Sequence, residues 1–140
     1  MKLLLDSSAI IFAFEYPHCN SRIIFDLVAA KKLEGVISEK AIEESKRMFA
    51  LNKKEGFLYL LELDLRRNFQ VIPVKAVQKE MQKWRGKIKE KDLEHLATAK
   101  ALKLPYLVAF DRDFEPFPEY HAPKKFVEVI LKMKAFETDY

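Results

Sequence analysis

Cysteine, glycine and long hydrophobic runs are all scarce in this sequence. The single cysteine, Cys19, excludes an internal disulfide and a cysteine-based zinc site, and it suits the reducing cytoplasm. Only three glycines occur, and none forms a glycine-rich phosphate loop after the first expected strand. The longest apolar runs, such as residues 9–14, are too short to cross a bilayer. The first apolar stretch is interrupted by Asp6, so no signal peptide is expected.

The rest of the composition is that of a globular protein. The chain has 140 residues, of which 49% are hydrophobic and 33% are charged. This length favours a single domain over residues 1–140. The net charge is +4 and the pI is near 9.1. Such a mild basic excess permits an anionic partner such as nucleic acid but does not require one.

Short apolar runs alternate with segments of helical periodicity. Four runs are expected to form buried strands: residues 2–5, 36–38, 69–74 and 106–110. Six segments are expected to form helices: residues 9–14, 21–30, 39–49, 57–65, 92–104 and 123–135. Ser7 or Ser8 suits the N-cap of the first helix and Ser38 that of the third, while Gly35 lies beyond the end of the second.

This alternation determines the expected fold. Strands separated by helices indicate parallel strands joined by right-handed crossovers. The sequence therefore predicts an α/β sandwich, with a central, mostly parallel sheet of four or five strands and helices on both faces. In such sheets ligands bind beyond the carboxyl ends of the strands, so acidic residues at those positions are candidates for chemistry.

Acidic residues occur at several such positions. Asp6 follows the first expected strand and Asp111 the fourth, Glu43 and Glu44 lie early in the helix after the second, and Asp92 lies in the first turn of the helix before the fourth. Carboxylates that meet at one edge repel one another unless a cation neutralises them. Oxygen ligands suit Mg²⁺ or Mn²⁺ rather than zinc.

Each of these acids also has an ordinary structural explanation. Asp6 could cap the following helix, and Asp92 could be a first-turn acid favoured by the helix dipole. Glu43 and Glu44 would usually belong to a solvated face, and Asp111 could belong to a turn. The order of all the acids along the chain, rather than any one of them, favours a shared site.

That order resembles the PIN-domain nuclease family, which includes the VapC toxins. The resemblance covers nearly the whole chain and rests on five segments: LLLDSSAI at 3–10, VISEKAIEE at 36–44, DLEHLATA at 92–99, LVAFDRDF at 107–114 and APKKF at 122–126. It implies a PIN-like fold.

The resemblance also implies roles for single residues. It implies five metal-binding acids, the first four of them catalytic: Asp6, Glu44, Asp92, Asp111 and Asp113. Ser8 would support the site through its hydroxyl group. Glu44 is preferred to Glu43 because the acid of the family falls six residues after the serine that ends the strand, here Ser38. The family often has Thr or Ser two residues before the fourth acid, where this chain has Ala109.

The activity that the resemblance implies is hydrolysis of RNA phosphodiester bonds with Mg²⁺ or Mn²⁺ as cofactor, leaving 5′-phosphate and 3′-hydroxyl ends. The protein would be the toxin of a toxin–antitoxin pair, inhibited by an antitoxin protein, or a housekeeping RNA-processing nuclease. A homodimer is also implied, for which Phe57, Tyr59 and Leu60 are candidate contacts unless they belong to the core. Because Ala109 lacks a hydroxyl group, a non-catalytic PIN-like module that binds RNA or protein is the alternative.

A basic stretch with one tryptophan precedes Asp92. Its candidate RNA contacts are Lys83, Trp84, Arg85, Lys87, Lys89 and Lys91. The cations could guide an RNA backbone while Trp84 stacks on a base. A solvated surface segment with a half-buried tryptophan explains the pattern equally well.

Two other kinds of site receive little support. The three histidines lack the paired spacing of a zinc site, and a surface or packing role is favoured for His95, one turn after Asp92. A phosphoacceptor receiver domain usually has paired acids after its first strand and a lysine after a late one. Here Asp6 stands alone, and the late strand ends in Asp111.

Overall fold

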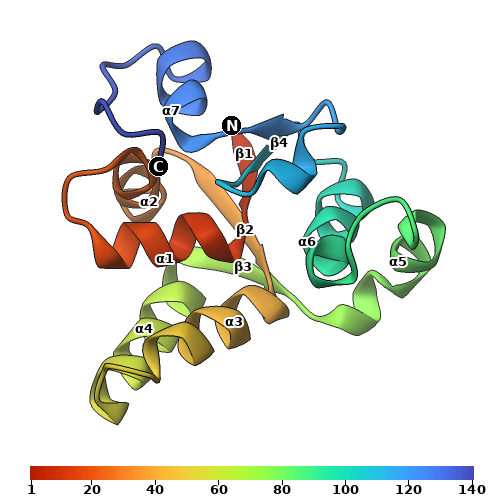
Figure 1. Cartoon of the computed structure of the whole chain (residues 1–140), viewed down its shortest axis with the longest axis horizontal. Helices are drawn as coiled ribbons and strands as arrows, with labels where there is room; N and C mark the ends of the chain where they lie inside the picture. Colours follow the sequence, from red (N-terminus) through yellow and green to blue (C-terminus); the bar gives the residue numbers. More distant parts are fainter.

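The computed structural model describes all residues, 1–140, and is built around one five-stranded sheet (Figure 1). The strands are β1 (Lys2–Leu5), β2 (Glu34–Ser38), β3 (Phe69–Ile72), β4 (Tyr106–Val108) and β5 (Tyr120–His121). Their order across the sheet is β3-β2-β1-β4-β5, and every neighbouring pair is parallel. The predicted parallel sheet is thus confirmed, with β1 at its centre.

Helices fill the connections between the strands. They are α1 (Ser7–Glu15), α2 (Asn20–Ala29), α3 (Glu39–Phe49), α4 (Glu55–Asn68), α5 (Gln78–Trp84), α6 (Glu90–Ala101) and α7 (Pro123–Lys125). Short 3₁₀ turns at Val74–Ala76 and Arg112–Phe114 and a π-helical turn at Phe126–Ile130 complete the fold. None of these helices has the length and hydrophobicity that crossing a bilayer would demand.

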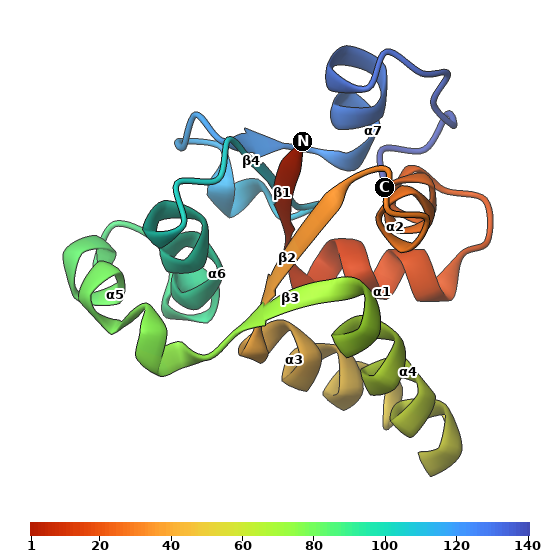
Figure 2. The same ribbon diagram turned by 180° about the vertical axis from the view of Figure 1, so that it is seen from behind.

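Helices cover both faces of the sheet, as predicted. Successive side chains of a strand point to opposite faces, so Leu3 and Leu5 pack into one hydrophobic core and Leu4 into another. The first core contains residues of α1 to α4 and of the turn after α7, and the second contains residues of α6. Figures 1 and 2 show α5 and α6 on the side of the sheet opposite to α1 and α2.

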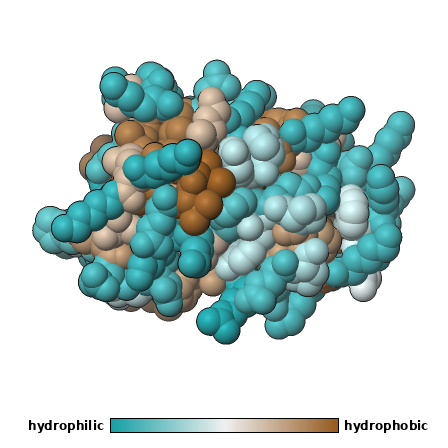
Figure 3. All heavy atoms as spheres, turned by 90° about the horizontal axis from the view of Figure 1, so that it is seen from above, coloured by the Kyte–Doolittle hydropathy of each residue, from teal (hydrophilic) through white to brown (hydrophobic).

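Polar and hydrophobic side chains are unevenly distributed over the face of the molecule seen from above. Viewed from above, the hydrophobic side chains lie mainly on the half that contains α2 and α7 (Figure 3). The half that contains α5 and α6 is mostly hydrophilic, as expected for the basic stretch that joins these helices.

Several predicted boundaries were wrong. The N-cap of α1 is Asp6, not Ser7 or Ser8, because its side chain accepts a hydrogen bond from the backbone N–H of Ala9. Gly35 lies inside β2 and does not end α2. A Cβ atom there would lie 2.5 Å from the Phe69 ring, so glycine permits this ring to pack on the strand.

Other elements are shorter than expected or were missed. β3 ends at Ile72, β4 ends at Val108, and the last helical segment ends at Ile130 rather than at residue 135. The helix expected from Asp92 begins at Glu90 and ends at Ala101, and neither α5 nor β5 was predicted. After Ile130 the chain lies against α2, where the buried Asn20 side chain hydrogen-bonds to the backbones of Phe136 and Thr138.

Candidate active site

A cavity of about 390 Å³ opens at the carboxyl edge of the sheet. All four predicted catalytic acids line it: Asp6, Glu44, Asp92 and Asp111. Asp6 follows β1, Glu44 lies in α3, Asp92 lies in α6 and Asp111 follows β4. The fold therefore brings together acids separated by up to 105 positions in the sequence (111 − 6 = 105). We call this space the carboxylate cavity.

Asp6 is fixed by the start of α1. Its Oδ1 accepts hydrogen bonds from the Ala9 N–H at 3.1 Å and from the Ser8 hydroxyl at 2.6 Å. The Ser8 oxygen in turn accepts from the Phe110 N–H at 3.0 Å, so one hydroxyl group links the ends of β1 and β4. Burial raises the pKa of Asp6. Asp6 therefore caps α1, as one interpretation predicted, and it also lines the cavity with the other acids.

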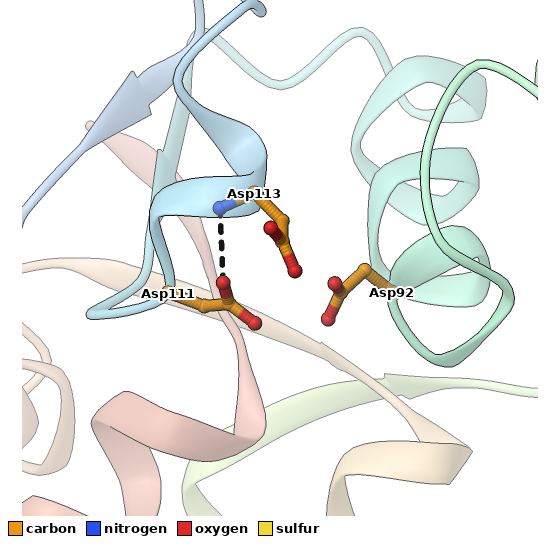
Figure 4. A group of neighbouring side chains, drawn as sticks. All are labelled: Asp92, Asp111 and Asp113. Atoms are coloured by element: carbon orange, nitrogen blue, oxygen red, sulfur yellow. Dashed lines mark hydrogen bonds between the residues drawn. The ribbon is translucent and has the colours of Figure 1, made fainter.

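Three aspartates form the densest group of charge. Carboxylate oxygens of Asp92, Asp111 and Asp113 all lie within 4.8 Å of one another, and the three side chains point into one space (Figure 4). The turn that holds two of them is closed by a hydrogen bond from the Asp113 N–H to Asp111 Oδ1 at 2.9 Å. The turn predicted for Asp111 is therefore present and brings two acids to face Asp92 on α6.

Asp92 is the least satisfied of these acids. Only 5% of the residue is exposed, and its Oδ2 is buried without a hydrogen-bond partner. Burial, with the negative charge of Asp111, raises the pKa of Asp92 to about 7. A buried polar group without a partner costs about 1–3 kcal/mol, so this arrangement favours the entry of a positive charge.

Two lysines of the predicted RNA-binding stretch supply part of that charge. Lys91 Nζ lies 2.9 Å from Asp111 Oδ2, 3.9 Å from Asp92 Oδ2 and 3.8 Å from Asp113 Oδ2. Lys89 Nζ lies 3.4 Å from Asp113 Oδ2. Partial burial favours a higher pKa for Asp111, but hydrogen bonds from the Asp113 N–H and Lys91 outweigh it and lower the pKa. The Lys91 side chain is 58% exposed, so little packing holds it in place.

Glu44 is held from two sides. Its Oε1 accepts a hydrogen bond from the Ser7 hydroxyl at 3.1 Å and lies 2.8 Å from Nε2 of His95. Partial burial favours a higher pKa for Glu44, but the hydrogen bonds from His95 and Ser7 outweigh it and lower the pKa. Glu43 is exposed and does not line the cavity, as the preference for Glu44 requires.

His95 is a residue whose place the sequence did not reveal. A surface position is wrong, because the residue is only 1% exposed. A packing role alone is also insufficient, because its ring nitrogens contact Ser38 and Glu44. Its position one turn after Asp92 on an expected helix was the available signal, but nothing in the sequence placed that helix beside α3.

The remaining members of the basic stretch lie outside the cavity lining. Arg85 pairs with Glu90 at 2.9 Å, and the ammonium groups of Lys83 and Lys87 lie 5.7 and 5.1 Å from the Trp84 ring centre. The half-buried Trp84 also meets the Phe117 ring edge to face, with the centres 5.8 Å apart. These contacts favour the packing interpretation of Trp84 over base stacking.

Ala109 is fully buried in the second core and does not line the cavity. Its methyl group therefore belongs to the hydrophobic core and not to the cavity lining.

Comparisons with known proteins agree with this geometry. The family model of the PIN domain matches residues 3–119, and the chain belongs to the PIN domain family. A search of curated protein sequences finds no match.

Two solved structures share the fold. One, described as a toxin–antitoxin complex from Klebsiella pneumoniae, has a TM-score of 0.67 and 20% identity, and the alignment covers 86% of this chain and 97% of that one. The other is VapBC2 from Rickettsia felis bound to a DNA fragment from its promoter. Its TM-score is 0.68 and its identity 17%, with 86% of this chain and 96% of that one covered.

Proposed function

We propose that this chain is a metal-dependent endoribonuclease and the toxin of a toxin–antitoxin pair. One observation carries the nuclease proposal: acids from four separate elements line a single cavity, and one of them, Asp92, has a buried oxygen without a partner. Family membership supports the same activity, since PIN domains are typically nucleases.

The donor set fits a hard divalent cation. Every charged ligand that the cavity offers is a carboxylate oxygen, the type that Mg²⁺ and Mn²⁺ prefer. Asp92, Asp111 and Asp113 would hold the cation most directly, with Asp6 and Glu44 completing the site. Such a cation lowers the pKa of bound water and offsets negative charge on a phosphodiester.

The chain's own residues would perform the remaining tasks. Ser8 and the start of α1 keep Asp6 in place, and the hydrogen bond from Ser7 holds the Glu44 carboxylate at the cavity wall. Lys91, exposed and held mainly by charge, would leave Asp111 and pair with a phosphate oxygen of RNA. Cleavage would leave 5′-phosphate and 3′-hydroxyl ends.

Cleavage assays on single-stranded RNA test the nuclease proposal. The wild-type chain should cut in Mn²⁺ or Mg²⁺ and stop in excess chelator, and Asp92→Asn should be inactive. Glu43→Gln removes a charge one position from Glu44 but outside the cavity, so it should cut like the wild type. Equal cutting by wild type and Asp92→Asn would refute the nuclease. No cutting and no binding of Mn²⁺ by the wild type would support the non-catalytic module.

The toxin role is supported by the two structures of similar fold, both described as toxin–antitoxin assemblies. Induced expression in a bacterial host should arrest growth, and Asp92→Asn should not. Co-expression of a short protein encoded immediately upstream should restore growth. A housekeeping nuclease would leave growth unaffected at the same expression level.

Two further parts of the proposal concern surfaces. Lys83, Arg85 and Lys87 are exposed, precede the cavity-lining Lys91 in the sequence and would contact the RNA backbone. Neutralising all three should weaken RNA binding and flatten its salt dependence.

A homodimer would use the α4 face, where Tyr59 and Leu60 are 66% and 63% exposed, whereas Phe57 packs partly against the core.

A further inference from the structure

His95 is a fully buried histidine in α6 that the proposed chemistry does not use. It does not line the carboxylate cavity, yet both of its ring nitrogens are engaged. Nδ1 lies 2.9 Å from the Ser38 hydroxyl oxygen at the end of β2, and Nε2 lies 2.8 Å from Oε1 of Glu44 in α3. The ring therefore links the end of a strand to one of the acids of the site.

The partners of His95 determine where its proton lies. A carboxylate only accepts hydrogen bonds, so Nε2 carries the hydrogen that reaches Glu44. The buried Ser38 oxygen accepts from the Ala41 N–H at 3.2 Å, and its own proton has Nδ1 as its only acceptor. A neutral ring protonated at Nε2 satisfies every donor and acceptor in this chain of hydrogen bonds.

The donors to Glu44 converge on one of its two oxygens. Ser7 from α1 and His95 from α6 both donate to Oε1, and no hydrogen bond involves Oε2. The Glu44 side chain is 22% exposed. Fixing a glutamate side chain costs conformational entropy, and these hydrogen bonds offset that cost before a cation binds.

A second contact makes the position of α3 relative to α6 specific. Glu94, the neighbour of His95, accepts a hydrogen bond from the backbone N–H of Lys40 in the first turn of α3 at 3.2 Å. Thus α6 holds α3 at its first turn through Glu94 and at Glu44 through His95. Only the second of these contacts reaches an acid of the cavity.

We infer that His95 is a positioning residue. Its Nε2–H holds Oε1 of Glu44, so that Oε2 remains available to a divalent cation in the carboxylate cavity. This inference rests on the proposed metal-dependent function. It adds a ligand-orienting pair, Ser38 and His95, in which the serine fixes the protonation of the ring and the ring fixes the acid.

The first test needs no substitution and no metal. In ¹⁵N-labelled wild-type protein, of 16.4 kDa, long-range nitrogen–proton correlation spectra should show His95 neutral with the proton on Nε2. A ring protonated at Nδ1, or one exchanging between both forms, would overturn the inference.

The second test compares two substitutions that retain different halves of the ring. The amide nitrogen of His95→Gln can reach the position of Nε2, whereas the amide of His95→Asn reaches only that of Nδ1. Titration with Mn²⁺ alone, followed by the electron paramagnetic resonance of the free ion, measures affinity. We expect His95→Asn to lose about 10–100-fold in affinity, as is typical for partners of metal ligands, and His95→Gln to lose less than about 3-fold.

Glu94→Gln is the matched control. It alters another contact between α6 and α3 without touching Glu44, so its Mn²⁺ affinity should equal that of the wild type. Equal losses in His95→Asn and His95→Gln at comparable melting temperatures would indicate a packing role and overturn the inference. If the wild type neither binds Mn²⁺ nor cuts RNA, the proposed function fails, while the spectra of the metal-free protein still decide whether Nε2–H holds Glu44.

Discussion

The two sides of the carboxylate cavity hold their charges in different ways. Asp6 and Glu44 receive hydrogen bonds from neutral donors, among them the hydroxyl groups of Ser7 and Ser8. Asp92 lies opposite with a buried oxygen that has no hydrogen-bond partner, and the nearest positive charge is the exposed Lys91 ammonium at 3.9 Å. The first side is thus ordered by the fold itself, whereas the second leaves a buried carboxylate oxygen unsatisfied, as the proposed cation site requires.

The largest effect is expected from a substitution of Asp92, on the second side of the cavity. Asp92→Asn should lower RNA cleavage and Mn²⁺ affinity by more than about 100-fold, beyond what loss of an outer partner costs, because a charged oxygen of the densest cluster disappears. Single-turnover cleavage and Mn²⁺ titration measure the two effects. Glu43→Gln serves as the control, and a loss of less than tenfold in Asp92→Asn would show that Asp92 is not a ligand.

Substitutions of Asp6 sharpen the contrast on the ordered side. Asp6→Ala removes the cap of α1, whereas Asp6→Asn keeps a capping oxygen, so the free energy of unfolding of Asp6→Ala should be lower than that of Asp6→Asn by about 1 kcal/mol. Both should be inactive. Urea denaturation in chelator measures the difference, and equal stabilities would mean that the cap contributes nothing.

The stability of metal-free Asp92→Asn tests how much the buried charge of Asp92 destabilises the folded protein. Because burial raises the pKa of Asp92 to about 7, its ionisation opposes folding. This cost is absent below the unfolded-state pKa near 3.8 and complete above about pH 7. Relative to the wild type in chelator, Asp92→Asn should therefore gain stability between pH 5 and pH 8, as urea melts would show. A gain that shrinks over this range would contradict the unpaired carboxylate.

The smallest expected effect concerns Lys91. Because its side chain is exposed, Lys91→Met should destabilise the metal-free protein by less than about 1 kcal/mol. The increase in melting temperature on adding Mn²⁺ should become larger, since the lysine no longer competes for the same carboxylates. An unchanged increase would show that Lys91 and the cation do not share ligands.

The positions of Asp6 and Asp111 were predictable because they follow from one rule about parallel sheets, whereas the choice of Glu44 and Asp92 depended on the family resemblance. Asp6 and Asp111 each come directly after a buried apolar run, and the ends of such strands meet at one edge. The alternation of strands and helices likewise predicted the α/β architecture. The strand β5 was missed because two residues are too few to show a periodicity.

Contacts between helices could not be predicted from the sequence in the same way. Ser38, Glu44 and His95 share no local spacing, and their relation exists only once α6 packs beside α3. The charge of the basic stretch was evident from the sequence. The ion pair between Lys91 and Asp111 was not, because it too is a long-range contact. Gly35 was misassigned because the packing of Phe69 against β2 is also a long-range contact.

The donors to Asp6 and to Glu44 converge on a single oxygen of each carboxylate, which would limit how these two acids could bind the proposed cation. Asp6 accepts both of its hydrogen bonds through Oδ1, and Glu44 accepts both of its own through Oε1. Each carboxylate would thus have one oxygen free of hydrogen bonds to offer to a cation. Mg²⁺ prefers octahedral coordination and retains several waters. Binding through one oxygen of each acid would therefore leave coordination positions for a nucleophilic water and for the phosphate group to be cut.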